Sequence, residues 1–391
     1  MNRDRFPGVA GPWARLDGPA GTQMVDVAIE AMDAWMRSGK GANYGGPFAA
    51  AVATEECVEE ARASVGRLLG AAPEDVAFGP SMTALTMRLS AAVGRTLAPG
   101  DEVVVTRLDH DANVRPWVIA AERAGAVVRW AEPDRDTLEL PAAAVEAVLS
   151  ERTRWVAVTA ASNACGTMPE LEAIVAAAHA AGARISIDAV AAVPHRRLDL
   201  GALGADTLAC SAYKWYGPHV GILCGAPGVF ADLRPDKLMP SPDAPHERFE
   251  LGTLPFESLA GVTAAAEYML GVGYDAIRAH EERLVSVAAD GLAAIGGVRL
   301  YGDPADRVPT LMFNVAGFTS AEVATALAER SVAVWDGNYY AWELERFLGL
   351  DPHGAVRAGF VHYNDETDAR RLVEAVREVA AGAAPPRAEA S

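Results

Sequence analysis

Short apolar runs alternate with longer stretches of helical spacing through the middle of the chain. Alanine-rich stretches at Val114–Ala124, Pro141–Ser150 and Leu171–Ala181 have helical spacing, and turn glycines such as Gly125 and Gly182 follow them. Apolar strands that alternate with helices are typical of a mostly parallel sheet covered on both faces. The pattern therefore predicts an α/β domain with strands at Glu102–Thr106, Val127–Trp130, Trp155–Thr159, Arg184–Ile187, Thr207–Ser211 and Gly221–Cys224.

The pattern changes after about residue 255. A long helical region, Pro255–Ala294, leads to alternating segments and a last helix near Thr367–Ala381. We expect a large α/β domain over residues 21–255 and a smaller α+β domain made of residues 1–20 and 256–380. Residues 381–391 are expected to be disordered, because this alanine- and proline-containing end can bury almost no apolar surface.

The charge balance, the apolar runs and the cysteines indicate which binding partners and which cellular location to expect. The 391 residues include 34 Lys and Arg against 52 Asp and Glu, which gives a formal net charge of −18. Cationic side chains drive binding to nucleic acid and to anionic membranes, so neither partner is expected. No apolar run is long enough to span a bilayer, and the first residues lack the apolar core of a secretory signal. The four cysteines form no CxxC pair and are expected to be buried thiols, which favours a cytoplasmic protein.

Several familiar motifs are missing from the sequence. No GxGxxG follows a strand, no HExxH occurs, and the histidines lack metal-ligand spacing. Neither a dinucleotide site nor a metal site is therefore expected. Ser211-Ala-Tyr-Lys214 matches the SxxK pattern of serine acyl-enzymes, but the SDN and KTG segments of those enzymes do not occur.

Polar residues at the ends of the apolar runs are the candidates for chemistry. In an open α/β sheet, ligands bind beyond the carboxyl ends of the strands. Lys214 closes the run TLACSAYK and Asp188 ends the run ARISIDAV, so both are expected at the same sheet edge. A desolvated lysine there can form a Schiff base, and a carboxylate can keep a pyridine nitrogen protonated. Taken singly, the two also fit a surface lysine and a turn aspartate.

The order of these motifs resembles that of the class V aminotransferase family, whose members depend on pyridoxal 5'-phosphate (PLP). The segment SIDAVAAVPH, followed by SAYKWYGPHVG, carries the resemblance, which runs from LDGPAGTQ at Leu16–Gln23 to VRAGFVHYNDETD at Val356–Asp368. Within the family the chain is most similar to the cysteine desulfurase and selenocysteine lyase group. The resemblance implies the aspartate-aminotransferase-like fold (fold type I), with a mostly parallel seven-stranded sheet in the large domain.

The resemblance also implies a role for each matching residue. Lys214 would carry PLP, Asp188 would pair with the pyridinium nitrogen and His110 would stack on the ring, and these three are the expected catalytic residues. Arg357 would bind the substrate α-carboxylate. Thr253 would reach the phosphate of the neighbouring subunit, which implies a homodimer with shared active sites. The other contacts to PLP would come from Ser81, Met82, Thr83, Asn163 and Ser211.

The chain departs from the desulfurase pattern at three places. The loop that carries the sulfur-accepting cysteine in desulfurases corresponds to Val334–Trp342, which has no cysteine and has Tyr340 near the expected position. Ala191 stands where a glutamine is common, and Tyr213 stands where a histidine usually precedes the lysine. The missing loop cysteine speaks against persulfide chemistry, and the three departures together indicate a desulfurase-like branch with altered chemistry.

The sequence thus predicts a PLP-dependent enzyme that acts on a small amino acid through an external aldimine. The favoured reaction is desulfurase-like cleavage of a C–S or C–Se bond without a persulfide cysteine. A class V aminotransferase and an amino-acid epimerase remain alternatives. A non-catalytic scaffold is a third, against which the complete catalytic set argues. The aromatic loop Val334–Trp342 fits either a substrate bulkier or flatter than cysteine or ordinary packing.

Overall fold

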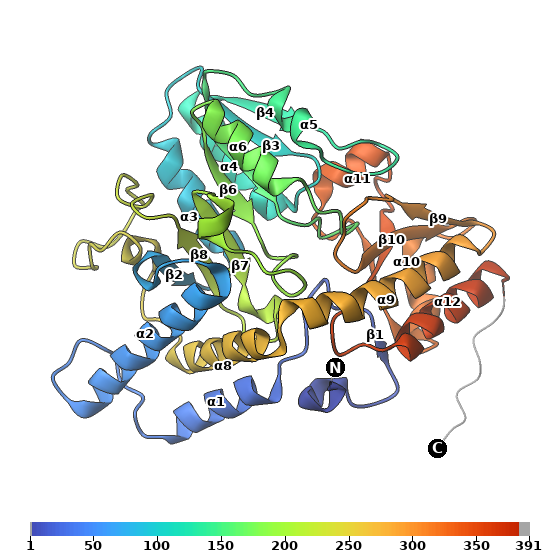
Figure 1. Cartoon of the computed structure of the whole chain (residues 1–391), viewed down its shortest axis with the longest axis horizontal. Helices are drawn as coiled ribbons and strands as arrows, with labels where there is room; N and C mark the ends of the chain where they lie inside the picture. The colour runs from blue at the N-terminus through green and yellow to red at the C-terminus, as the bar shows by residue number, and fades with distance from the viewer. Residues whose placement is uncertain (1, 383–391) are drawn as a thin grey trace.

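Residues 2–382 are described by the computed structural model (Figure 1). The strands are β1 (Ala14–Arg15), β2 (Val76–Gly79), β3 (Glu102–Thr106), β4 (Val127–Ala131), β5 (Thr153–Thr159), β6 (Arg184–Asp188), β7 (Thr207–Ser211), β8 (Gly221–Gly225), β9 (Val298–Tyr301), β10 (Thr310–Val315), β11 (Val332–Ala333), β12 (Trp335–Gly337) and β13 (Ala355–Gly359). The helices are α1 (Asp26–Arg37), α2 (Ala49–Leu69), α3 (Met82–Gly94), α4 (Arg115–Ala124), α5 (Ala142–Glu146), α6 (Leu171–Ala180), α7 (Leu200–Leu203), α8 (Phe256–Val272), α9 (Tyr274–Ala293), α10 (Ser320–Ala328), α11 (Trp342–Leu348) and α12 (Glu366–Ala380).

The large sheet has seven strands in the order β2-β8-β7-β6-β5-β3-β4. Strands β7, β6, β5, β3 and β4 are parallel to one another, whereas β8 pairs antiparallel with both β7 and β2. All six predicted strands are confirmed, with ends within two residues of the predicted ones. The sequence pattern does not reveal β2, because a run of only four residues does not stand out from its surroundings.

Side chains alternate along each strand between two helical layers. Val103 and Val105 on β3 belong to one apolar cluster with residues of α3 and α4, while Val104 belongs to another that includes Ile174 on α6. Because both faces of the sheet are covered, its strands are apolar at nearly every position. This arrangement leaves the carboxyl ends of the parallel strands as the place where polar side chains gather.

The predicted helical region Pro255–Ala294 is confirmed, and the structure divides it into two helices. Helix α8 ends at Val272 and α9 begins at Tyr274, with Gly273 between them at φ 80°. A backbone in this left-handed region cannot continue an α-helix, and glycine adopts it at little cost. Helix α8 packs against α1 and α2, and α9 runs on as the long rod across the middle of Figure 1 to reach the smaller domain.

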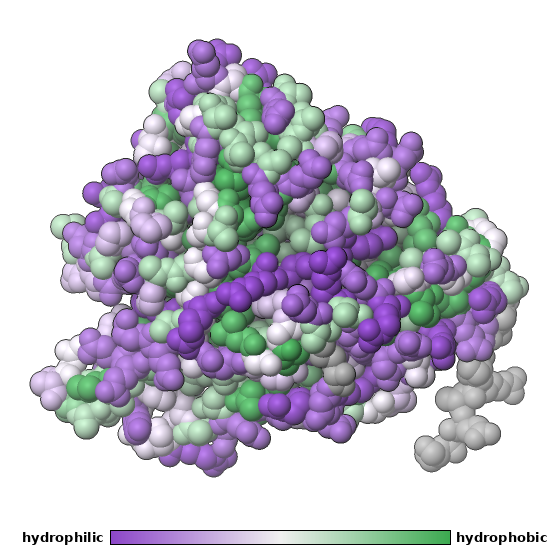
Figure 2. Space-filling view, viewed as in Figure 1, coloured by the Kyte–Doolittle hydropathy of each residue, from purple (hydrophilic) through white to green (hydrophobic). Residues whose placement is uncertain are grey.

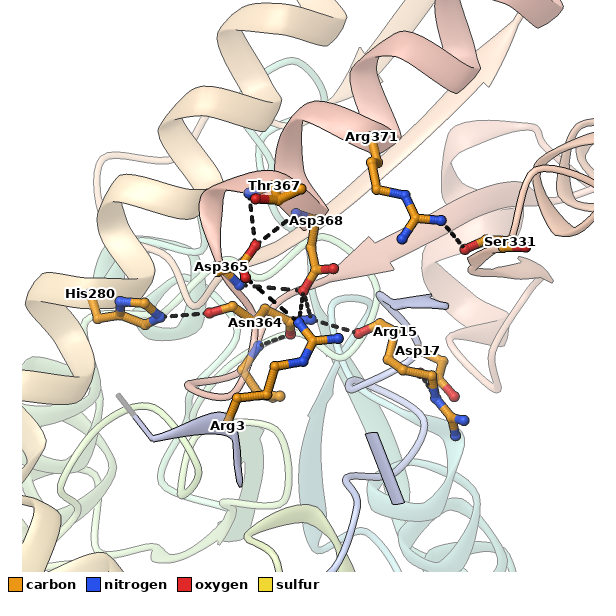
Figure 3. Close-up of polar contacts among 11 residues, drawn as sticks. Arg3, Arg15, Asp17, His280, Ser331, Asn364, Asp365, Thr367, Asp368 and Arg371 are labelled. Carbon is orange, nitrogen blue, oxygen red and sulfur yellow. Dashed lines mark hydrogen bonds and ion pairs between the residues drawn. The ribbon is translucent and has the colours of Figure 1, made fainter. Parts of the chain in front are cut away.

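The smaller domain is built on a four-stranded antiparallel sheet in the order β12-β13-β10-β9. The N-terminal segment joins it, since β1 pairs in parallel with β11 and Asp17 bridges to Gly359. Figure 3 shows the same attachment at α12, where Arg3 Nη1 lies 2.8 Å from Asp368 Oδ2. The exact division into residues 21–255, 1–20 and 256–380 stays a prediction. Of the predicted disordered tail, residues 383–391 lie outside the described part of the chain.

The hydropathy of the surface, the character of the helices and the state of the cysteines can be compared with what the composition predicts. Figure 2 shows a mainly hydrophilic face with apolar residues in smaller patches. Among the helices of residues 2–382, none has the length and apolar character to cross a bilayer. All four cysteines are buried and unpaired, as predicted.

A buried ion pair anchors the segment that leads to Thr253. The guanidinium of Arg62 on α2 meets the Glu250 carboxylate through two bonds of 2.9 Å, and both residues are buried. Glu250 Oε1 also accepts the backbone N–H of Phe78 on β2 at 2.8 Å. The two-pronged geometry and the third donor satisfy charges that burial would otherwise make costly.

Replacement of one partner of this pair should be strongly destabilising. Glu250→Ala is expected to lower the free energy of unfolding by about 3–5 kcal/mol. It removes the buried carboxylate that neutralises Arg62, which keeps the Val76 carbonyl and the exposed Glu59 carboxylate, and it leaves the Phe78 N–H without its acceptor. Urea unfolding followed by circular dichroism measures the change. The double variant Arg62→Met/Glu250→Leu removes both charges and is expected to recover much of the loss. Equal stability of the single and double variants would contradict this account of the pair.

Candidate active site

Two adjoining cavities lie at the carboxyl edge of the large sheet. The inner cavity has a volume of about 80 Å³ and the outer one about 830 Å³, and His110, Asn163 and Lys214 line both. Arg357 lines the outer cavity, which also meets the smaller domain. Thr253 lines neither of these two cavities and is exposed on the surface. All the other predicted site residues line the inner cavity, namely Ser81, Met82, Thr83, His110, Asn163, Asp188, Ser211 and Lys214.

Lys214 lies just beyond β7, at the end of a short 3-10 turn that spans Ala212–Lys214. Its Nζ donates to the carbonyl of Pro19 and lies 5.2 Å from the centre of the Tyr213 ring. The pKa of the amine is lowered to about 7, mainly by burial and also by the Arg357 charge, while the Asp188 carboxylate acts in the opposite direction. A substantial share of this amine is therefore uncharged near neutral pH, which is the form that acts as a nucleophile or base.

Asp188 occupies the end of β6, in register with Thr159 on β5 and Ala209 on β7. The carboxylate is buried, and its Oδ1 accepts the backbone N–H of Val190 at 2.9 Å. Burial raises its pKa to about 6, against the effects of the Val190 N–H and of Lys214. A buried carboxylate held in this way favours a cationic or N–H partner inside the cavity.

His110 follows β3 and presents its ring to both cavities. Its Nδ1 accepts the backbone N–H of Ala112 at 3.0 Å, which places the proton of the neutral ring on Nε2. Burial lowers its pKa to about 4, and the charges of Lys214 and Arg357 act in the same direction. The Tyr340 ring stacks on the imidazole with centroids 5.4 Å apart and planes 20° apart. The imidazole is therefore an uncharged, flat wall at neutral pH.

Arg357 on β13 and Asn163, in the loop after β5, join the two domains at the cavity. Arg357 Nη1 donates to the Asn163 carbonyl at 2.9 Å, and the guanidinium carbon lies 4.5 Å from the centre of the Tyr339 ring. Asn163 Nδ2 donates to the Tyr339 carbonyl at 2.8 Å. Within residues 2–382, Asn163 Oδ1 and Arg357 Nε are buried and have no hydrogen-bond partner. Unpaired buried polar atoms are costly, so their presence here suits a site that receives a ligand.

The N-terminus of α3 forms a cradle with the end of β7. Ser81 Oγ accepts the N–H of Ala84 at 3.1 Å, and Ser211 Oγ accepts the N–H of Met82 at 3.0 Å. Gly221 on β8 is required for this close approach, because a Cβ there would lie 2.1 Å from the Ser81 carbonyl carbon. Hydroxyls and backbone N–H groups at the positive end of a helix can hold a phosphate.

Sequence reasoning assigned no role to three contributors to this region. The Pro19 carbonyl reaches Lys214 from the N-terminal segment, and Gly221 makes room for Ser81. Asp109 is fully buried beside His110 and accepts from Thr106 Oγ1 and from Asn113 Nδ2, and burial raises its pKa to about 7. An acidic residue directly before His110 and a glycine inside a strand were the available signals.

A metal centre has no support in the geometry. Across residues 2–382, no group of three or more His, Cys, Asp or Glu side chains is placed so that it could hold a metal ion. The cavities instead combine one lysine, one buried carboxylate, an uncharged imidazole and an arginine. This set can bind an anionic amino acid and move a proton at a carbon next to its amine.

Comparisons with known proteins show the family of the chain. The family model described as "Aminotransferase class-V" matches residues 14–372. "Probable cysteine desulfurase 1" of Mycobacterium leprae is 33% identical over 385 residues, which cover 95% of this chain but only 62% of that protein. "Cysteine desulfurase" of Dickeya dadantii is 32% identical over 94% of this chain and 92% of its own length.

Solved structures share the architecture over almost the whole chain. The cysteine desulfurase CsdA from Escherichia coli superposes with a TM-score of 0.88 at 26% identity, covering 97% of both chains. The apo cysteine desulfurase from Thermococcus onnurineus NA1 gives a TM-score of 0.92 at 26% identity, again covering 97% of both chains. The predicted fold class is therefore confirmed.

Proposed function

This chain belongs to the class V aminotransferase family of PLP enzymes, and we propose that it is a desulfurase-like lyase that cleaves a C–S bond without a persulfide cysteine. One observation carries the proposal. The wall of the outer cavity, formed by residues Trp335 to Tyr340, has no thiol, and all four cysteines are buried in other parts of the chain. A lyase that releases the sulfur as a thiol does not need a thiol of its own.

The cavity residues fit PLP by position and charge. Asp188 would hold the proton on the pyridine nitrogen, His110 would lie against the ring, and the Asn163 amide would face the phenolic oxygen. When bound, PLP supplies an electron sink for the charge that develops at the substrate Cα. The phosphate would rest in the cradle made of Ser81, Met82, Thr83 and Ser211.

The remaining residues would bind the substrate and move its proton. Burial lowers the pKa of Arg357 to about 10, so its guanidinium stays charged at neutral pH and can bind the α-carboxylate. The Lys214 amine, with its pKa lowered to about 7, is suited to take the Cα proton. Elimination then breaks the bond between Cβ and sulfur, and the sulfur leaves with the electron pair and takes up a proton.

Product analysis of the holoenzyme tests the proposal. With L-cysteine and with S-methyl-L-cysteine as substrates, we expect pyruvate and ammonia in equal amounts, together with sulfide or methanethiol. No keto acid should be needed, and mass spectrometry of the protein after turnover should find no sulfur added to a cysteine. Alanine formed together with a protein persulfide would contradict the proposal. Dependence on a keto acid would indicate an aminotransferase, and loss of the α-deuteron with a racemised product would indicate an epimerase.

The lowered pKa of Lys214 predicts how cofactor uptake depends on pH. The rate at which the apoprotein attaches PLP should rise about tenfold between pH 6 and pH 8, because the reactive uncharged amine increases as the pH passes about 7. Stopped-flow absorbance measures this rate. Arg357→Met removes a positive charge beside the amine and should move the midpoint to higher pH. A rate that is flat across this range would contradict the lowered pKa.

The quaternary structure and the compartment are also proposals. Gly252 adopts φ 73° in an exposed loop, and Leu251 beside it is 59% exposed. Thr253 is exposed and lies outside both cavities of its own chain, which fits a homodimer in which Thr253 reaches the partner's phosphate site. The four unpaired thiols support a reducing, cytoplasmic location.

A further inference from the structure

The outer cavity is large for a substrate as small as cysteine. Its volume of about 830 Å³ lies in the range of pockets that enclose drug-sized ligands, and the cavity would hold the substrate together with the part of PLP that the inner cavity of about 80 Å³ is too small to enclose. Lys214 and Arg357, which would hold the amine end and the carboxylate, line only part of it. The remaining wall combines the polar residues Asp111, Arg115, Asp336 and Asn338 with an apolar and aromatic set, namely Met87, Pro116, Trp335, Tyr339 and Tyr340.

Tyr340 presents a ring held in place for stacking. One face lies on His110, yet the residue is 71% exposed, so much of the ring remains open. Its carbonyl accepts the N–H of Asp111 at 2.7 Å, and its N–H donates to Asn338 Oδ1 at 2.9 Å. Trp335, which is 51% exposed, adds a second open aromatic surface to the same cavity.

The backbone under this ring adopts a costly conformation. Tyr339 has φ 49° and Tyr340 has φ 60°, in a region that residues with a side chain seldom occupy. Two such residues in succession persist only where surrounding contacts hold them, and such positions are concentrated at functional sites. Here the contacts come from Asn163 and Asp111 in the large domain, which hold the carbonyls of Tyr339 and Tyr340. An exposed aromatic ring in so constrained a place suits a ligand better than packing.

We infer that the substrate is an S-substituted L-cysteine whose sulfur carries a flat aromatic group, and that Tyr340 selects this group by stacking. The inference rests on the proposed lyase function and names its substrate class. The reaction balances as R–S–CH2–CH(NH3+)–COO− plus water giving R–SH, pyruvate and ammonium. The C–S bond breaks and an S–H bond forms, with no oxidant, reductant or sulfur acceptor.

Binding of uncleavable analogues to the holoenzyme tests the selection by Tyr340. In 2-amino-5-phenylpentanoate, carbon replaces the sulfur of S-benzyl-L-cysteine, and 2-aminopentanoate is the matched compound without the ring. Isothermal titration calorimetry should find the phenyl compound bound about tenfold or more tightly. Tyr340→Ala should remove most of that preference, whereas Tyr340→Phe, which keeps the ring, should retain it. Equal binding of the two analogues, or a preference that Tyr340→Ala leaves intact, would overturn the inference.

Measurements of turnover distinguish a failure of the aromatic substrate class from a failure of the proposed lyase function. The release of thiol and pyruvate should give S-benzyl-L-cysteine a kcat/KM about tenfold or more above that of S-methyl-L-cysteine, and Tyr340→Ala should reduce the ratio. Equal kcat/KM values would support the lyase function and overturn the aromatic substrate class. Selective binding of the phenyl analogue without thiol release from either compound would refute the lyase function and still support selection by Tyr340.

Discussion

Lys214→Ala is expected to abolish covalent attachment of PLP and to lower turnover by about 10²–10⁴-fold, the range for loss of a positioned base. The chain has only three lysines, Lys40, Lys214 and Lys237, and Lys214 alone lines the cavities described above. Borohydride reduction of the holoenzyme, followed by peptide mass spectrometry, should find the cofactor on the peptide that contains Lys214. The variant should show no such adduct.

The other two lysines are matched controls for this experiment. Lys40 is exposed, and Lys237 Nζ donates to the carbonyl of Ser241 in a surface loop. Lys40→Ala and Lys237→Ala should therefore retain the adduct on Lys214. Cofactor fixed to either of them in the Lys214→Ala protein would show that the assignment is wrong.

Arg357→Ala should weaken binding of an amino acid to the holoenzyme by about 1.5–3 kcal/mol, or about 10- to 150-fold in Kd. The reason is the loss of a charge-assisted pair between the guanidinium and the α-carboxylate. Calorimetry with 2-aminopentanoate measures the change, and thermal unfolding checks that the variant is folded. An unchanged affinity would remove Arg357 from the substrate site.

Two controls connect this effect to the carboxylate. Arg357→Lys keeps the charge but loses the planar fork, so it should recover only part of the affinity. Butylamine, which lacks the carboxylate of 2-aminopentanoate, should bind wild type and Arg357→Ala with similar affinity. If the variant lost affinity for both ligands equally, Arg357 would act through the shape of the site and not through the carboxylate.

The positions of several site residues could be predicted, because these residues follow directly after apolar, strand-like runs of the sequence. Asp188 and Lys214 close two such runs, and parallel strands bring their carboxyl ends to one edge of a sheet. The motif around His110 likewise follows β3. Because helical crossovers make consecutive strands parallel and side chains alternate along each strand, the sequence was enough to place these residues near one another.

Other features escaped prediction because they depend on packing. The break between α8 and α9 lies at a single glycine inside a region with helical spacing on both sides. Gly221 matters only because the Ser81 backbone passes within reach of a Cβ at that position. The stacking of Tyr340 on His110 joins residues from different domains, and no local pattern records such a contact.

The sequence by itself determined the α/β architecture, six of the seven strands of the large sheet and the chemical types gathered at the sheet edge. These follow from periodicity and residue chemistry, which act over a few neighbouring positions. Only the tertiary structure decided that Arg357 meets Asn163 across the domains, that Tyr340 covers His110, and that the Lys214 pKa falls to about 7. Each of these depends on residues that are distant in the sequence but pack together and bury one another. Such burial is a property of the folded chain as a whole.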